Sequence, residues 1–265
     1  MAFVEIDGKK LYYEVQGSGR ALVLVHAAMM NTRFWDAQIE AFAAHFRVVC
    51  YDLYGYGQSA FTEQKKINHT ADLKALLTHL GIETAAVVGV SMGAEMVLNF
   101  TLTYPQMVEA MVLVGSGVDG YDYPATGWEW WGDFVGAARA GDYPRAVELM
   151  TEHALEGHNA PLPPAVRVRI QDIARSYDFR HYADDTLLWA APASDTPPAK
   201  RLGEIACPTL IMAGAQEHPL ILEIAEFMTQ RIKGAQKAIV GDAAHLVNLS
   251  QPEVFNRTVL AFLKQ

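Results

Sequence analysis

The chain has 265 residues, of which 51% are hydrophobic and 19% charged, and its formal net charge is −9. This length supports a large buried core in one α/β domain with an additional subdomain, and the composition excludes a disordered chain. The acidic balance and the lack of a basic run exclude nucleic acids and anionic membrane surfaces as expected partners. The N-terminus has no signal-peptide pattern and no apolar run is long enough to span a bilayer, so we expect a cytoplasmic protein without stable membrane association.

The two cysteines, Cys50 and Cys207, lie in apolar surroundings at the edges of expected strands. Neither belongs to a C-x-x-C motif of the redox or zinc-binding kind. We therefore expect free thiols, as in a reducing compartment, and no metal ion.

Strands and helices alternate through the first part of the chain. Residues 2–6 and 9–15 flank Asp7-Gly8 and predict a hairpin with a two-residue turn. The elements expected next are a strand at 21–26, a helix at 33–45, a strand at 47–51, a helix at 70–80, a strand at 85–90, a helix at 94–104 and a strand at 108–114. This alternation predicts a mostly parallel sheet with helices on both faces.

A long segment between two expected strands interrupts the alternation. Residues 117–201 show no buried-strand pattern, and helices are expected near 128–140, 144–156, 164–177 and 181–189. Because this connection is far longer than usual, we interpret 117–201 as an inserted helical cap. Residues 1–116 and 202–265 then form the core domain, which resumes with strands at 209–213 and 236–240 and ends in a helix at 252–263.

The pentapeptide Gly89-Val90-Ser91-Met92-Gly93 has the form G-x-S-x-G and joins an expected strand to an expected helix. In this context the glycines allow a tight reversal that exposes the serine hydroxyl above the sheet. The helix N-terminus behind it offers N–H groups and a partial positive charge to a developing oxyanion. Ser91 is the expected nucleophile, and the alternative is a glycine-rich turn with an incidental serine.

A nucleophilic serine needs a base, which is usually histidine. His245 follows the last expected strand, at the sheet edge where parallel strands carry catalytic groups. Most of the other histidines, among them His69 and His181, fall in helical or polar segments and are expected at the surface.

Glu217 is the expected acid that orients His245. It follows the strand at 209–213 and gives the chain order serine, acid, histidine. Asp119, after the strand at 108–114, is a rival acid, and Asp242 is too close to His245 along the chain to be preferred. His218 is not preferred as the base, because no second acid lies in a matching place.

The expected oxyanion hole consists of two backbone N–H groups. One belongs to Met92, directly after the nucleophile, and the other to Ala28, in the loop after the strand at 21–26. His26, at the start of this loop, is expected to hold the loop by hydrogen bonds.

Five segments together resemble the serine-dependent α/β-hydrolase-fold family, among its small capped esterases, lactonases and carbon–carbon bond hydrolases. They are Leu24-Val25-His26, Tyr51-Asp52-Leu53-Tyr54-Gly55-Tyr56-Gly57-Gln58-Ser59, the Ser91 pentapeptide, Leu210-Ile211-Met212-Ala213-Gly214 and Ala244-His245-Leu246-Val247-Asn248. The resemblance implies an eight-stranded, mostly parallel sheet with a helical cap, a Ser91–Glu217–His245 triad and no cofactor. A similarity to 3-oxoadipate enol-lactonases is visible.

Four positions depart from the family pattern. Ala27 replaces the usual glycine after His26, Tyr54 replaces a usual arginine, Glu217 replaces the commoner aspartate, and Glu95 stands where a small residue is common. The methyl group of Ala27 is expected to tighten or re-aim the oxyanion loop. The charge of Glu95 suits the first turn of a helix, so a structural role is favoured over contact with the pocket.

Apolar and aromatic side chains predict a pocket for an apolar or aromatic ester. The expected lining residues are Met29, Trp35, Tyr121, Trp128, Trp131, Trp189 and Leu246. The alternative for the aromatic residues is that they anchor the cap to the core.

The expected reaction is hydrolysis of a small to medium carboxylic ester or lactone through an acyl-enzyme on Ser91. One alternative is carbon–carbon bond cleavage of a diketone by the same triad, and another is a ligand receptor on a hydrolase scaffold. Dehalogenases and epoxide hydrolases of this fold carry aspartate at the position of Ser91 and are disfavoured. The sequence does not identify the acyl group and leaves a homodimer open.

Overall fold

An eight-stranded sheet forms the centre of the protein in a computed structural model, which describes all residues except 1, 60, 62–66, 125–128, 156–161 and 184–194. The strand order is β1-β2-β4-β3-β5-β6-β7-β8. β1 and β2 pair antiparallel, β2 is antiparallel to β4, and every later pairing is parallel. The expected mostly parallel sheet of eight strands is confirmed.

The strands follow the sequence pattern closely. Their bounds are β1 Ala2–Ile6, β2 Lys9–Gln16, β3 Ala21–Val25, β4 Arg47–Tyr51, β5 Ala85–Val90, β6 Val108–Val114, β7 Thr209–Gly214 and β8 Gln236–Val240. β3, β5 and β7 are buried along their whole length, as expected of strands covered on both faces. Asp7 and Gly8 both have positive φ in the hairpin turn, as the two-residue turn requires.

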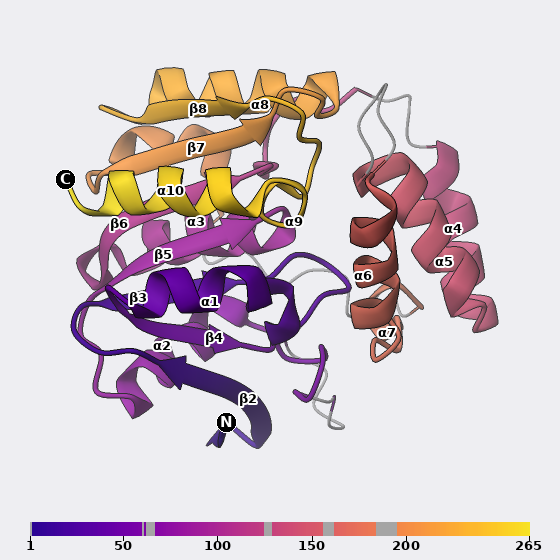
Figure 1. Cartoon of the computed structure of the whole chain (residues 1–265), viewed down its shortest axis with the longest axis horizontal. Helices are drawn as coiled ribbons and strands as arrows, with labels where there is room; N and C mark the ends of the chain where they lie inside the picture. The colour runs from indigo at the N-terminus through magenta and orange to yellow at the C-terminus, as the bar shows by residue number, and fades with distance from the viewer. Residues whose placement is uncertain (1, 60, 62–66, 125–128, 156–161, 184–194) are drawn as a thin grey trace.

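Helices cover both faces of the sheet (Figure 1). α1 Asp36–Ala43 and α10 Pro252–Leu263 lie on one face, while α2 His69–His79 and α3 Met92–Thr103 lie on the other. α8 Pro219–Arg231 packs against β7 and β8. The expected helix at 33–45 begins instead with a 3₁₀ turn, Thr32–Trp35, and a short helix that the pattern did not predict, α9 Val247–Ser250, precedes α10.

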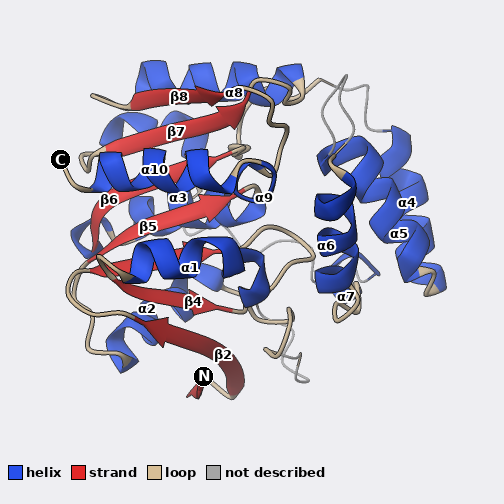
Figure 2. Cartoon of the chain, in the orientation of Figure 1, coloured by secondary structure: helices blue, strands red, loops and turns tan. Residues whose placement is uncertain are grey.

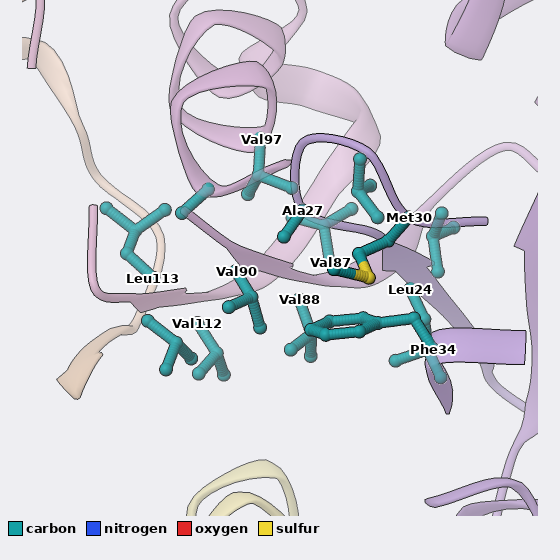
Figure 3. Close-up of a cluster of buried hydrophobic side chains, with 14 of the residues drawn as sticks. Leu24, Ala27, Met30, Phe34, Val87, Val88, Val90, Val97, Val112 and Leu113 are labelled. Carbon is teal, nitrogen blue, oxygen red and sulfur yellow. The ribbon is translucent and has the colours of Figure 1, made fainter. Parts of the chain in front are cut away.

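The core lies where β3, β5 and β6 meet the start of α3. Figure 3 shows Val88 of β5 and Val112 of β6 on the face of the sheet that Phe34 covers, while Val97 of α3 packs near Val87 on the other face. Phe34 from the turn after β3 joins the same cluster and is fully buried. The loop after β3 is therefore held by hydrophobic packing as well as by hydrogen bonds.

Between β6 and β7 the described residues are helical and form no strand. The helices are α4 Glu129–Ala140, α5 Tyr143–Met150, a π-helical turn at Thr151–Leu155, α6 Pro164–Ala174 and α7 Arg180–Ala183. They form a separate layer beyond the carboxyl ends of the parallel strands (Figure 2). Residues 184–189 of the expected last cap helix lie outside the described residues. The division into a core of 1–116 and 202–265 and a cap of 117–201 stays a prediction.

Polar contacts join α6 to the loop after β3. Arg33 donates to Asp172 at 2.6 Å, and Asn31 Nδ2 donates to Ser176 Oγ at 3.1 Å. Arg169 pairs with Asp36 and donates to the carbonyl of Arg33 at 2.7 Å. The helical layer is thus attached to the segment that contributes Ala28.

The expectation that His69 and His181 lie at the surface is wrong, because both are buried. His181 stacks on Tyr56 with ring centroids 4.3 Å apart, and Tyr56 stacks on Tyr177 at 4.7 Å. Burial lowers the pKa of each histidine to about 3, so both are neutral at physiological pH. Tyr54, in place of the family's arginine, is fully buried and packs edge-on against Phe61.

A substitution at Gly93 tests the close approach between α3 and β3. A Cβ at this position would lie 2.5 Å from the carbonyl oxygen of His26 and closer still to that of Val25. We expect Gly93→Ala to lower the free energy of unfolding by about 1–3 kcal/mol or more, because backbone atoms cannot move aside cheaply. Chemical denaturation measures this change. Gly136→Ala is the control, because its Cβ meets nothing within 4 Å inside α4 and helix propensity predicts a gain of up to about 1 kcal/mol. Equal stability of Gly93→Ala and the wild type would contradict the close approach.

Candidate active site

Ser91 lies in a strained turn between β5 and α3. Its φ of 55° and ψ of −123° fall in a region that costs a non-glycine residue about 1–3 kcal/mol. The turn is held because Ser91 N donates to the carbonyl of Val114 at 2.8 Å and the Ser91 carbonyl accepts from Ala94 N at 2.8 Å. A Cβ on Gly89 would lie 2.6 Å from Ala94 N, so the reversal also requires a glycine there. The serine is thus presented at the carboxyl end of β5, as predicted.

His245 and Glu217 form a buried hydrogen-bonded pair. His245 Nδ1 lies 2.7 Å from Glu217 Oε2, and the two residues are 6% and 3% exposed. Glu217 Oε1 also accepts from the backbone N–H of His218 at 2.9 Å. With Nδ1 bonded to the carboxylate, Nε2 on the opposite side of the ring remains for a substrate or a nucleophile.

The backbone brings the two loops of this pair together. Gln216 N donates to the carbonyl of Ala243 at 2.9 Å, which joins the loop after β7 to the loop after β8. A Cβ on Gly214 would overlap the carbonyls of Ala243 and Ala244, so the loops approach more closely than a larger residue permits. The pair is therefore positioned by main-chain contacts.

The charge around His245 favours the imidazolium. Burial lowers the pKa of His245 and is the largest single effect, but the charge and hydrogen bond of Glu217 and the charge of Glu95 raise it. The pKa of His245 is consequently raised above its ordinary value of 6.5. Glu217 thus favours the protonated form that a general base passes through.

The rival acids do not take this place. Asp119 lies exposed after β6, and the carboxylate that bonds His245 Nδ1 belongs to Glu217. His218 caps α8, where its Nδ1 accepts from Leu220 N at 3.2 Å. The carbonyl of Asp242 accepts from Gln251 Nε2 at 3.2 Å.

The N–H groups expected in the oxyanion hole have no protein acceptor within the described residues. This holds for Met92, the first residue of α3, and for Ala28. The close approach of Gly93 to the carbonyls of Val25 and His26 places the start of α3 against the loop that contains Ala28. The N–H groups of Met92 and Ala28 thus lie in neighbouring segments, and both are available to donate to a ligand.

His26 holds the oxyanion loop, as expected. Leu53 N donates to its Nε2 at 3.0 Å, so Nδ1 carries the proton and donates to the carbonyl of Ala27 at 2.8 Å. Burial lowers the pKa of His26 to about 4, which keeps this arrangement neutral. The left-handed residue of the loop is Met29, with φ 62°, rather than Ala27, the position at which the family pattern suggested sensitivity to a methyl group.

The expected pocket residues differ in their surroundings in the structure. Trp35 is fully buried and packs on Phe34 and Phe255, which favours a core role over a pocket role. Tyr121 packs edge-on against Phe227 of α8 at 5.0 Å, which favours anchoring. Trp131 contacts Phe134 and Tyr182 among the inserted helices. Met29 and Leu246, beside Ala28 and His245, are buried, while Trp128 and Trp189 lie outside the described residues.

Gly115, at the end of β6, supports the pair and was not predicted. Its φ is 56°, and a Cβ there would lie 3.1 Å from His245 Nδ1 and 3.3 Å from Glu217 Oε2. Glycine directly after an expected central strand was the available signal. Asn248 was missed as well. Its Nδ2 donates to the carbonyl of Phe34 at 3.3 Å, which ties the His245 loop to the segment after β3.

Other possible sites in the described residues carry less chemistry. A hollow of about 280 Å³ is lined by Thr101, Glu109 and Cys207 among others, at the opposite end of α3 from Ser91. No cluster of three or more His, Cys, Asp or Glu side chains in the described ranges is suited to a metal ion. None of the described helices is long and apolar enough to cross a membrane. Cys50 and Cys207 are free thiols, and Cys50 is buried.

Comparison with known proteins agrees with this geometry. Residues 20–252 match the family model described as the alpha/beta hydrolase fold. The chain belongs to this family. It is 26% identical to a carboxylesterase of Bacillus subtilis over 92% of this chain and 80% of the relative. It is 27% identical to 3-oxoadipate enol-lactonase 1 of Acinetobacter baylyi over 97% of this chain and 94% of the relative.

A solved hydrolase from Pseudomonas aeruginosa PA01 superimposes on this family member with a TM-score of 0.83. The sequence identity is 25%, and the match covers 100% of this chain and 98% of the other. These similarities support hydrolase activity for the family member described here.

The pKa of His245 provides a direct check of the Glu217 contact. We expect Glu217→Gln to lower this pKa, because the variant loses the carboxylate that offsets burial. Without that charge, burial dominates and the pKa falls toward or below 6.5. Histidine ring signals followed by NMR across a pH titration measure the change. Asp119→Asn is the control, and we expect it to leave the pKa of His245 unchanged. If Asp119→Asn lowers this pKa and Glu217→Gln does not, the acid that orients His245 is Asp119.

Proposed function

We propose that this protein is a serine hydrolase that cleaves a small to medium carboxylic ester or lactone through an acyl-enzyme on Ser91. The observation that carries the proposal is the buried 2.7 Å contact between His245 and Glu217 at the same sheet edge as the strained Ser91 turn. A base oriented by an acid, at the same sheet edge as a partly exposed serine, is the arrangement that acyl transfer requires.

In the first half-reaction Ser91 Oγ attacks the substrate carbonyl as His245 Nε2 takes the hydroxyl proton. The N–H groups of Met92 and Ala28 stabilise the oxyanion of the tetrahedral intermediate. The imidazolium, held by Glu217, then gives its proton to the leaving alcohol oxygen as the carbon–oxygen bond breaks. An acyl-enzyme and the free alcohol result, or a ring-opened acyl-enzyme in the case of a lactone.

The second half-reaction repeats these roles with water. His245 takes a proton from water as the water oxygen attacks the acyl carbonyl. His245 then gives the proton to Ser91 Oγ as the bond between Oγ and the acyl carbon breaks and the carboxylic acid leaves. The residues so assigned accomplish the whole cycle without a cofactor or metal ion.

Similarity to a carboxylesterase and an enol-lactonase supports a hydrolase of this reaction class over a ligand receptor. Carbon–carbon bond hydrolysis of a diketone uses the same groups and remains an outcome of a substrate screen. A ligand receptor on this scaffold is the outcome if ligands bind tightly and are not turned over.

Ser91→Ala tests the proposed function. We expect turnover of aryl esters or lactones to fall on the order of 10³-fold or more, because alanine has no nucleophilic oxygen. Initial rates across a series of ester chain lengths and lactones measure the loss, and circular dichroism checks the fold. Ser18→Ala, in an exposed loop, is the matched control and keeps wild-type rates. Wild-type turnover in Ser91→Ala would rule out the acyl-enzyme.

A further inference from the structure

Glu95 is a charged side chain beside the proposed catalytic groups that the reaction above does not use. It lies one helical turn after Ser91, and its backbone N–H donates to the Ser91 carbonyl at 3.2 Å. Residues four apart share a helix face, and helical side chains tilt toward the N-terminus of the helix. The Glu95 side chain is therefore directed toward the end of α3 that presents Ser91.

Gly117 shows where the carboxyl group of Glu95 lies. A Cβ on Gly117 would overlap Glu95 Oε1 and lie 2.8 Å from the Tyr123 hydroxyl. Two residues earlier on the same segment, Gly115 is in comparable contact with His245 and Glu217. Two residues span at most about 7 Å of chain. The Glu95 carboxyl and the His245–Glu217 pair thus pack on one short stretch after β6.

The electrostatic environment of Glu95 contains other acids and one histidine. Burial raises its pKa to about 7, the charge of Asp119 adds to this, and His245 opposes it. No Lys or Arg among the described residues contributes to this shift. Glu95 in turn contributes to the raised pKa values of Tyr123 and of Tyr182 in α7. Its carboxyl group therefore lies between the segment after β6 and the inserted helices.

We propose that Glu95 selects substrates by charge: it excludes acyl groups that carry a carboxylate and favours those that carry an ammonium group. This proposal rests on the proposed serine hydrolase function. An anionic group bound beside Glu95 would be repelled by the carboxylates of Glu95 and Asp119, and no Lys or Arg of the described residues contributes to the pKa shift of Glu95. An ammonium group would instead gain a carboxylate partner and the neighbouring ring of Tyr123.

The selection depends on pH because the charge of Glu95 does. At pH 8 the carboxyl group is ionised, and at pH 6 it is largely protonated. The groups that face it are Asp119 and Tyr123 after β6, Tyr182 of α7 and His245 after β8. Taking the ratio of kcat/KM for two substrates at one pH cancels the ionisation of His245, which affects both equally.

The test uses three aryl esters of equal acyl length: hexanoate, the adipate monoester and 6-aminohexanoate. At pH 8 we expect the wild type to prefer hexanoate over the adipate monoester by roughly tenfold or more in kcat/KM. Glu95→Gln should reduce this preference about tenfold and should reduce the relative rate on 6-aminohexanoate. Opposite changes for the anionic and cationic esters identify a charge effect, since a structural defect alters all three in the same direction.

Two controls make the result decisive. Glu253→Gln removes an equal charge from an exposed position on α10 and leaves the ratios unchanged. The wild type itself should lose most of its discrimination between pH 8 and pH 6, which tests the proposal without any substitution. If turnover depends on Ser91 but the kcat/KM ratios between the esters respond neither to Glu95→Gln nor to pH, the role of Glu95 is overturned and the proposed hydrolase function stands.

Failure of the proposed function gives a different result. If none of the esters is turned over, calorimetry compares pentylboronic acid with 4-carboxybutylboronic acid as ligands of the wild type and Glu95→Gln. If the wild type binds the neutral ligand more tightly than the anionic one, and Glu95→Gln reduces this difference in affinity, charge selection is supported even without turnover. Equal binding of both ligands to both proteins overturns it.

Discussion

The contact between the N-terminus of α3 and the end of β3 is the constraint on which the rest of the site depends. The carbonyls of Val25 and His26 lie so near Gly93 that no Cβ fits between them. This approach sets the free N–H of Met92 beside the loop of Ala28 and forces the Ser91 backbone into its strained conformation. The buried packing of β3, β5 and α3 offsets that strain, since close-packed interiors resist local relaxation (Figure 3).

A second constraint acts through charge. The His245–Glu217 pair is buried at the carboxyl ends of β7 and β8, where desolvation penalises the imidazolium. Main-chain bonds between the two loops hold the carboxylate 2.7 Å from Nδ1, so that its charge and hydrogen bond, together with the charge of Glu95, outweigh the desolvation and raise the pKa of His245. Glu95 acts in the same direction on His245 while its own charge is disfavoured by burial. The ionisation of the base and of Glu95 is therefore coupled, and a change at either residue alters the other.

The inserted helices contact the site through the oxyanion loop and an aromatic stack. Asn31 and Arg33, close after the residues of the oxyanion loop, bond to Ser176 and Asp172. On the other side, Tyr56 stacks on both Tyr177 and His181, which also contact each other, and its hydroxyl donates to Met92 Sδ at 3.4 Å. Displacement of the helical layer would consequently disturb both segments that carry the oxyanion donors.

Local sequence patterns determined the strands, most helix positions and the three members of the proposed triad. Ser91, Glu217 and His245 each follow a parallel strand, and parallel strands end at a common edge, so chain order alone predicts that they lie near one another. The family resemblance, now shown by the match over residues 20–252, supplied the strand number.

Only the tertiary structure decided which side chains became buried and what they faced. His69 and His181 were expected in solvent, and Trp35 was expected in the pocket, because the pattern within a helix or loop does not reveal which distant element covers it. The positions of Gly115, Gly117 and Glu95 around His245 depend on how the loops after β6 and β8 meet α3. That arrangement is set by contacts between residues far apart in the chain, and it determines the charge near the nucleophile.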